Sequence, residues 1–137
     1  MKTVVTFGVF DYFHIGHLRL FKSIKERTGA DRLIVAVQRS DFIKKYKPQQ
    51  VLFYSDEQRI EIISSLSIVD EVVIYTDVDV TIKEIDFDIF ARGEDQDHAG
   101  FMRATEYVNS IGKEVIIMNR TKNISSTDIK EKVKKLS

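Results

Sequence analysis

Short runs of β-branched and other apolar residues recur along the chain and alternate with stretches of helical periodicity. Continuous apolar runs of this length are typical of strands that are buried on both faces of a sheet. They predict four strands, at 4–7, 33–37, 71–75 and 114–118, and a weaker fifth at 89–91. Apolar residues spaced three and four positions apart predict helices at 18–27, 56–66 and 101–111. Hydroxyl groups at its start and lysines at its end predict a further helix at 126–136.

The alternation of predicted strands and helices indicates an α/β protein. We expect a single Rossmann-like domain, in which a mostly parallel five-stranded sheet carries helices on both faces and right-handed crossovers join the strands. No linker, low-complexity tract or internal repeat divides the 137 residues. One domain covering 1–137 is therefore expected.

Parallel sheets bind their ligands at the carboxyl ends of the strands, so the segments that follow strands are where chemistry is expected. Those segments are 8–17, 38–47, 92–98 and 120–127. Three of the four are rich in polar groups that suit a phosphate ligand.

The first of these segments, GVFDYFHIGH, leads from a predicted strand into a predicted helix. Gly8 allows the backbone to turn sharply. His14 and His17 stand three positions apart, which puts both imidazoles on one side of the helix start. Gly16 leaves room for a ligand against the N–H groups of the helix N-terminus. This arrangement suits the binding of a phosphate group whose negative charge grows in a transition state. The competing interpretations are that the two histidines bind zinc or that they have no special function.

The whole string resembles the GxFDxxHxGH motif of the cytidylyltransferases, especially that of the glycerol-phosphate enzymes. The resemblance implies that His14 and His17 are catalytic and stabilise the α-phosphate of the nucleotide during attack. It also implies nucleotide contacts at four other positions of the motif, Gly8, Val9, Phe10 and Gly16. Asp11 is expected to serve the substrate side of the site, through hydrogen bonds to loops or near the divalent ion, with a turn-forming role as the equal alternative.

A second motif lies near the end of the sequence. Residues 120–127 read RTKNISST, which is similar to the RTxxIS(S/T)T motif of the same family, and 68–72 is similar to the family's YVDEV segment. In that family the Arg and the hydroxyls hold the β- and γ-phosphates. Nucleotide contacts are therefore expected at Arg120, Thr121, Ile124, Ser125 and Ser126. Taken alone, Ser-Ser-Thr would be an ordinary helix N-cap.

The same resemblance suggests roles for charged residues elsewhere. Lys44 is expected to be catalytic, and Lys47 is expected to bind the substrate. Arg59 is expected either to bind the substrate's phosphate or to form a surface ion pair. Gly93 and Asp95 match a family string that contacts the nucleotide.

Together these motifs predict an enzyme that transfers a cytidylyl group from CTP to a small phosphorylated alcohol and releases pyrophosphate. Mg²⁺ is the expected cofactor and is held mainly by the triphosphate, so no metal-binding residue is assigned. The family implies a homodimer. His98, the third histidine, has no assigned role.

Composition narrows the range of partners. The 21 basic residues balance the 21 acidic ones, which argues against nucleic-acid binding. No apolar run approaches the roughly 20 residues of a membrane span, and the N-terminal segment lacks the cleavage pattern of a signal peptide. We therefore expect a cytoplasmic protein. The absence of Cys excludes disulfides and thiolate metal sites.

Several departures from the family pattern leave the acceptor open. Val9 replaces the usual Thr, Ser67 stands where the glycerol-phosphate enzymes typically have Arg, and the chain has no Trp. Ethanolamine, choline, serinol or sugar-alcohol phosphates compete with glycerol-3-phosphate as acceptor. The acidic residues Glu94, Asp95 and Asp97 would suit an amine-bearing acceptor. An ATP-dependent adenylyltransferase and a nucleotide-binding module without catalysis are the alternative functions.

Overall fold

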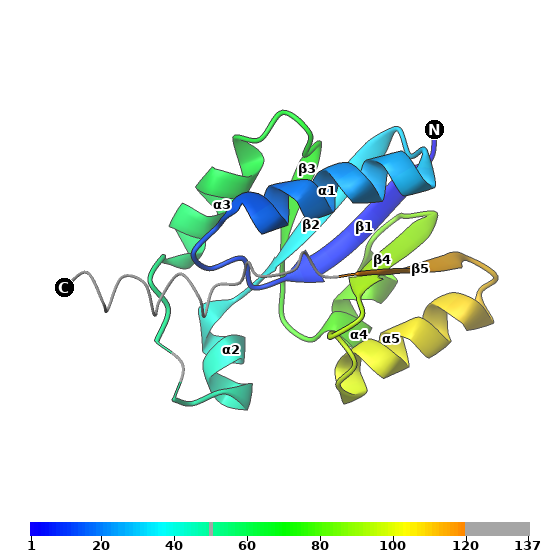
Figure 1. The fold of residues 1–137 in the computed structure, drawn as a ribbon. Helices are drawn as coiled ribbons and strands as arrows, with labels where there is room; N and C mark the ends of the chain where they lie inside the picture. Colours follow the sequence, from blue (N-terminus) through cyan, green and yellow to red (C-terminus); the bar gives the residue numbers. More distant parts are fainter. Residues whose placement is uncertain (50, 120–137) are drawn as a thin grey trace.

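The structure, a computed structural model, describes residues 1–49 and 51–119, which form an α/β unit around one sheet (Figure 1). The sheet has five parallel strands in the order β3-β2-β1-β4-β5. The strands are β1 (Thr3–Gly8), β2 (Arg32–Gln38), β3 (Glu71–Tyr75), β4 (Ile89–Gly93) and β5 (Glu114–Met118). The helices are α1 (Ile15–Thr28), α2 (Ser40–Tyr46), α3 (Asp56–Ser64), α4 (Val78–Thr81), the 3₁₀ turn η1 (Ile82–Glu84) and α5 (Ala99–Ser110).

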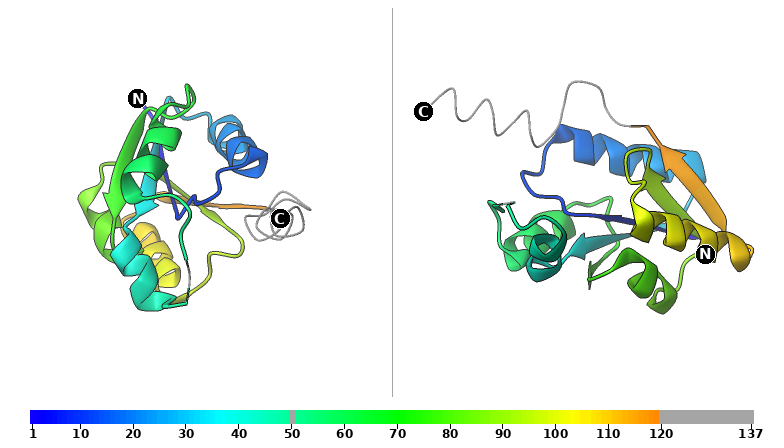
Figure 2. Two further views of the ribbon diagram at one scale, coloured as in Figure 1. Left: turned by 90° about the vertical axis from the view of Figure 1, so that its left-hand side faces the viewer. Right: turned by 90° about the horizontal axis from the view of Figure 1, so that it is seen from below.

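Apolar side chains cover both faces of the sheet, as the continuous runs of Val and Ile predict. One core cluster joins the sheet to α1 and α3, and a second joins the opposite face to α4 and α5. Figure 2 shows α1 and α5 on opposite sides of the sheet. The predicted α/β fold with helices on both faces is confirmed, and the sheet is entirely parallel.

The strand order places a topological switch point between β1 and β4. From β1 the chain adds β2 and β3 on one side, then crosses over to add β4 and β5 on the other. The loops after β1 and β4 therefore diverge at the carboxyl edge and leave a crevice between them, which is the usual ligand position in such sheets.

The predicted strands are all present, and β4 is two residues longer than predicted. The predicted capping box at the start of α3 is also present, because Ser55 and Gln58 exchange side-chain and backbone hydrogen bonds. Helix α2 was not predicted. It has only seven residues, and its N-cap residue makes no side-chain capping bond, so the usual start signal is missing. The helix predicted at 126–136 lies outside the described residues.

Candidate active site

The turn between β1 and α1 is tight. A Cβ atom added at Gly8 would come within 2.7 Å of the Phe10 ring, so glycine is required for this close approach. Phe10 and Tyr12 have positive φ angles of 55° and 49°, a conformation that is uncommon for residues with side chains. The Phe10 ring is buried in the core against the rings of His17 and Phe21. Only the backbone of Phe10 is therefore able to make the nucleotide contact expected from the sequence.

His14 and His17 lie together at the start of α1, as their spacing predicts. His14 is the N-cap residue, and its Nδ1 accepts a hydrogen bond of 3.0 Å from the Gly16 N–H. The Nδ1 of His17 accepts a 3.2 Å hydrogen bond from the His14 N–H, which completes a capping box made of two histidines. The two rings stack with centroids 3.9 Å apart and planes inclined by 25°.

These hydrogen bonds select the tautomer of both rings. A neutral imidazole has one donor nitrogen and one acceptor nitrogen. Because Nδ1 of His14 and of His17 each accept a backbone N–H, the proton of each ring lies on Nε2. The site thus has two Nε2–H donors on stacked rings beside a helix N-terminus, where negative charge is stabilised. Phe13 stacks on the outer side of His17 at 5.3 Å and helps to keep its ring in place.

Asp11 joins this turn to a distant segment. Its side chain is buried, and its two carboxylate oxygens accept hydrogen bonds of 2.8 Å from the Phe53 N–H and 3.0 Å from the Tyr54 N–H. The loop hydrogen bonds expected for Asp11 are thus present and anchor the segment at 53–54. Its expected contact with the substrate or the divalent ion stays a prediction. The anchored segment leads directly into α3.

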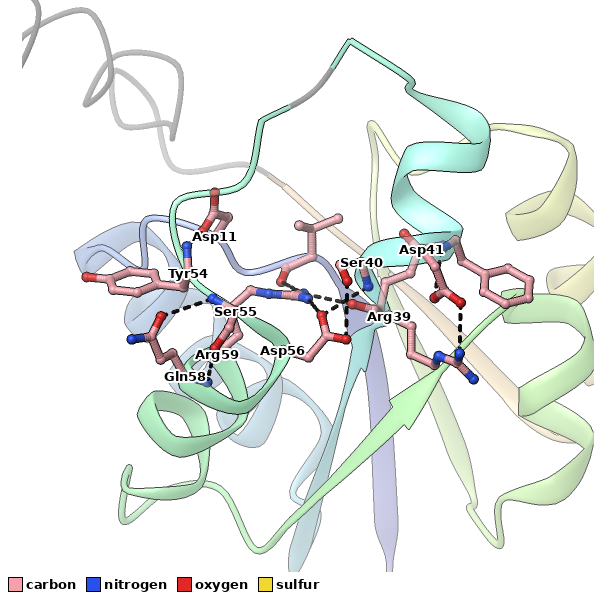
Figure 3. A network of polar contacts seen from close by, with 12 residues as sticks. Asp11, Arg39, Ser40, Asp41, Tyr54, Ser55, Asp56, Gln58 and Arg59 are labelled. Atoms are coloured by element: carbon pink, nitrogen blue, oxygen red, sulfur yellow. Dashed lines mark hydrogen bonds and ion pairs between the residues drawn. The ribbon is translucent and has the colours of Figure 1, made fainter.

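Arg59 requires a correction. The sequence predicted a substrate contact or a surface pair, but the side chain has no exposed surface. Its Nη1 donates to the carbonyl oxygens of Val9 at 3.0 Å and Gln38 at 2.7 Å, and its Nη2 pairs with Asp56 (Figure 3). Arg59 thus joins the carboxyl ends of β1 and β2 to α3 rather than reaching the substrate.

The same network positions α2. The carboxylate of Asp56 accepts hydrogen bonds from the backbone N–H of Ser40 at 3.0 Å and from its hydroxyl at 3.3 Å (Figure 3). Helix α2 begins at Ser40 and carries Lys44, with Lys47 at its C-cap. Lys47 lines a cavity at the carboxyl edge of the sheet. Lys44 and Lys47 are both exposed, and Lys44, like His14 and His17, is not among the described residues that line this cavity. The order of the two lysines expected from the sequence stays a prediction.

The end of β4 is tied to the end of β1 by Gln96. The Gln96 side chain donates through Nε2 to the Phe7 carbonyl at 2.7 Å and accepts through Oε1 from the Gly93 N–H at 2.8 Å. An added Cβ at Gly93 would lie 2.8 Å from the Asp95 carboxylate. Gly93 and Asp95 therefore lie together at the carboxyl end of β4, and their expected contact with the nucleotide stays a prediction. Gln96 is a residue that sequence reasoning did not assign.

A cavity of about 550 Å³ opens at this edge. Its walls come from the ends of β1, β2, β3 and β4 and from α2, α4 and α5. The described lining residues are Gly8, Val9, Gln38, Ile43, Lys47, Tyr75, Asp77, Val78, Asp79, Asp95, Gln96, His98, Ala99, Gly100, Phe101 and Arg103. Burial strongly raises the pKa of the Tyr75 hydroxyl, against a smaller opposing effect of Arg59, so this group stays protonated.

Asp77 and Asp79 are cavity residues that the sequence analysis missed. The rule that ligands bind after parallel strands applies equally to the segment that follows β3, and applying it there would have found both.

The second predicted motif, with Arg120, Thr121, Ile124, Ser125 and Ser126, lies outside the described residues, and its contacts stay predictions. Among residues 1–49 and 51–119 there is no group of three or more side chains suited to hold a metal ion. No helix within these ranges is long and apolar enough to cross a membrane.

The parallel sheet, the switch-point crevice and the paired imidazoles define the class of nucleotidyltransferases. A family model described as Cytidylyltransferase-like matches residues 5–132, and the chain therefore belongs to the cytidylyltransferase-like family.

Named relatives support this assignment. A glycerol-3-phosphate cytidylyltransferase of Bacillus subtilis is 31% identical over 137 residues, which cover 97% of this chain and 98% of the relative. An FAD synthase of Pyrococcus abyssi is 35% identical over 118 residues, 84% of this chain and 77% of the relative. Among solved structures, a lipopolysaccharide core biosynthesis protein of Thermoplasma volcanium superposes with a TM-score of 0.71 and 28% identity, covering 90% of this chain and 99% of that one.

Proposed function

We propose that the protein transfers a cytidylyl group from CTP to a small phosphorylated alcohol, with glycerol-3-phosphate as the first acceptor to test. The observation that carries the proposal is the pair of stacked imidazoles, His14 and His17, with both Nδ1 atoms occupied by backbone N–H groups. The glycerol-3-phosphate cytidylyltransferase of Bacillus subtilis, which aligns over nearly the whole chain, supports both the reaction and the acceptor.

In the proposed reaction, an oxygen of the acceptor's phosphate attacks the α-phosphorus of CTP. The bond from the α-phosphorus to the bridging oxygen of the β-phosphate breaks, and pyrophosphate leaves with that electron pair. The products are a CDP-alcohol and pyrophosphate. Such a transfer depends on positioning and charge stabilisation, because the protein forms no bond to the substrate.

The residues at the carboxyl edge suit this chemistry. The Nε2–H groups of His14 and His17 would donate to the α-phosphate oxygens, on which charge grows as the attacking oxygen approaches. Lys47, at the C-cap of α2, would neutralise part of that charge. Gly8 lines the cavity, and Asp95 would accept a hydrogen bond from the nucleotide. The predicted second motif would hold the departing pyrophosphate.

Mg²⁺ is proposed as the cofactor. It usually keeps several waters and binds through substrate phosphates and at most one or two carboxylates, so the triphosphate would supply most of its ligands. When bound, it would neutralise charge on the triphosphate and favour departure of pyrophosphate. Loss of pyrophosphate release in the presence of a chelator, restored by added Mg²⁺, is the expected result.

A homodimer that uses the end of the molecule near the first motif is also proposed. Val51 and Phe53 are 82% and 62% exposed, and the Phe53 ring lies 5.0 Å from that of Tyr12. Apolar groups exposed together in this way favour an interface, and light scattering of the purified protein tests for a dimer.

We place the protein in the cytoplasm, where nucleoside triphosphates are available, and propose neither a nucleic-acid nor a membrane partner.

Adenylyl transfer from ATP is the second candidate. The FAD synthase relative favours it, because FAD contains an adenine nucleotide. Pyrophosphate release measured in parallel with CTP and ATP distinguishes the two. Absence of release with both nucleotides and every acceptor would favour a binding module without catalysis.

A further inference from the structure

The sheet opens between β1 and β4 at its carboxyl edge. The two strands pair with each other at residues 4–6 and 89–91. Farther along, β1 stays paired with β2 as far as Gly8, and β4 stays paired with β5 as far as Gly93. Within the described residues, the last two positions of β1 and of β4 are thus paired on their outer sides only, and the crevice between the strands begins there.

The side chain of Gln96 spans this opening. Its Nε2 donates a 2.7 Å hydrogen bond to the Phe7 carbonyl, and its Oε1 accepts a 2.8 Å hydrogen bond from the Gly93 N–H. Both backbone groups belong to the positions that the ladder no longer joins. A side-chain amide has a donor and an acceptor, as a peptide group does. Gln96 therefore satisfies both strands and sets the spacing between them.

The turn from Gly93 to Gln96 is held at other points as well. Arg92 is buried, and its Nη1 donates to the carbonyl oxygens of Gly93 and Gln96, each at 3.2 Å. The Gln96 N–H donates to the Gly93 carbonyl at 3.1 Å, and the Glu94 N–H donates to the Met118 carbonyl at 2.9 Å. Hydrogen bonds thus fasten the turn to the ends of β1, β4 and β5.

This turn carries Asp95 to the crevice. Asp95 and Gln96 line the cavity together with Gly8 and Val9 of the first motif. Because an added Cβ at Gly93 would lie 2.8 Å from the Asp95 carboxylate, the carboxylate lies against the backbone of the turn. Its position therefore depends on the conformation of the turn, which Gln96 helps to fix.

Gln96 is better suited to position another group than to bind the ligand through its own amide. If the amide turned toward a ligand, it would leave the Phe7 carbonyl and the Gly93 N–H without their partner. Phe7 is buried, and a buried backbone group without a partner is costly. The amide of Gln96 therefore serves the two strands.

We propose that Gln96 is a positioning residue, which holds β1 and β4 at a fixed spacing and so places the Asp95 carboxylate for contact with the nucleotide. The proposal rests on the proposed transferase function, in which Asp95 accepts a hydrogen bond from the nucleotide. Loss of Gln96 then acts on nucleotide binding, and it acts through Asp95.

The test measures the dissociation constants of CTP and ATP by calorimetry, with Mg²⁺ and without an acceptor, and follows the nucleotide that binds more tightly. Gln96→Met keeps an unbranched side chain but removes the amide donor and acceptor. We expect the Kd of this variant to rise about tenfold, the scale of losing one hydrogen bond to a charged group. Asp97→Asn, at a neighbouring exposed position, should keep the Kd within about twofold of the wild type.

A double variant tests whether Gln96 acts through Asp95. Asp95→Ala alone should raise the Kd about tenfold, because it removes the carboxylate. Adding Gln96→Met to Asp95→Ala should change the Kd by less than about a further twofold, since the positioned group is already gone. Independent effects would multiply to about a hundredfold, and that result would overturn the proposal.

Gln96→Glu provides a second variant in case Gln96→Met does not fold. It keeps an acceptor for the Gly93 N–H but loses the donor to the Phe7 carbonyl, so it should also weaken nucleotide binding. A purely structural role would lower the amount of folded protein, and hence the measured kcat, without changing the Kd. Wild-type affinity in the folded variants, or failure of both to fold, would remove the positioning role of Gln96.

The wild-type protein separates this proposal from the proposed function. If it releases pyrophosphate while the Gln96 variants bind the nucleotide as tightly as the wild type does, only the role of Gln96 fails. If the wild type binds neither CTP nor ATP, the transferase function fails, and the placement of Asp95 for a nucleotide fails with it.

Discussion

The two halves of the site are built in different ways. The turn after β1 holds its histidines with hydrogen bonds between residues two and three positions apart. The region from β2 to α3 is held by contacts between residues far apart in sequence. Arg59 reaches Val9 across 50 positions, and Asp11 reaches Phe53 across 42. The first region can be recognised from a short string of residues, whereas the second becomes visible only when the chain has folded.

This difference explains what the sequence could predict. Strands, sheet type and the placement of Gly8, Gly16 and the two histidines around the start of α1 follow from local patterns and from the family motif. The distant partners of Asp11 and Arg59 do not, because an isolated Asp or Arg has the same appearance in a sequence whether it binds substrate or anchors a loop. The sequence could not show which of the two lysines of α2 faces the site, for a related reason. Without the helix, their directions relative to the cavity were unknown.

The largest expected effect comes from the local half of the site. His17→Ala should lower kcat by about 10²-fold or more, because it removes a donor to the phosphate in the transition state. Steady-state pyrophosphate release measures it. His17→Gln is the matched variant, since Gln at this helix position can preserve the capping box. It should lose activity to a similar degree while keeping the thermal unfolding midpoint of the wild type.

If His17→Gln kept nearly full activity, the imidazole would have only a capping role. The distinction between a catalytic turn after β1 and a supporting region from β2 to α3 would then be wrong.

The long-range half should respond mainly in stability. Arg59→Met removes a buried cation that donates to two carbonyl oxygens and pairs with Asp56. We expect the free energy of unfolding to fall by about 3 kcal/mol, the lower end of the cost of breaking a buried pair. Urea denaturation measures it. Arg19→Met, at an exposed position of α1, should change stability by less than about 0.5 kcal/mol.

An unfolding free energy in Arg59→Met close to that of the wild type, accompanied by a large rise in KM for the acceptor, would contradict the supporting role. It would restore the expectation that Arg59 binds the substrate.

The two lysines give a sharper test of the geometry. Lys47→Ala should lower kcat/KM by about tenfold, because Lys47 lines the cavity, and loss of one charged hydrogen bond is worth about 1.5–3 kcal/mol. Lys44→Ala should lower it by no more than about threefold. Acceptor titrations of both variants at one CTP concentration provide the comparison, and a larger loss in Lys44→Ala would instead support the order expected from the sequence.

The smallest effect concerns stability far from the cavity. Partial burial raises the pKa of Asp70, but the hydrogen bond from the Leu33 N–H and the ion pair with Lys25 outweigh it, so the pKa lies below its ordinary value of 3.8. The folded protein binds a proton at Asp70 less readily than the unfolded chain does. The ionised carboxylate therefore stabilises the fold above pH 3.8, and this stabilisation is lost as the pH falls through the lower pKa of the folded state. Asp70→Asn should cost about 0.5–1 kcal/mol at pH 7.

Urea denaturation of the wild type and of Asp70→Asn between pH 7 and pH 3 measures this dependence. The difference between the two proteins should shrink toward pH 3, whereas Asp86→Asn, at an exposed position, should differ little from the wild type at any pH. A difference that stayed constant with pH would show that the carboxylate charge of Asp70 does not stabilise the fold.

The central claim is that the paired imidazoles serve cytidylyl transfer to an alcohol phosphate. Pyrophosphate release by the wild-type protein with Mg²⁺, with CTP and ATP each offered with the same set of alcohol phosphates, tests it most directly. The account predicts release with CTP, and at least 10²-fold less in His17→Gln. Release with ATP alone, or equal rates in the wild type and His17→Gln, would contradict it.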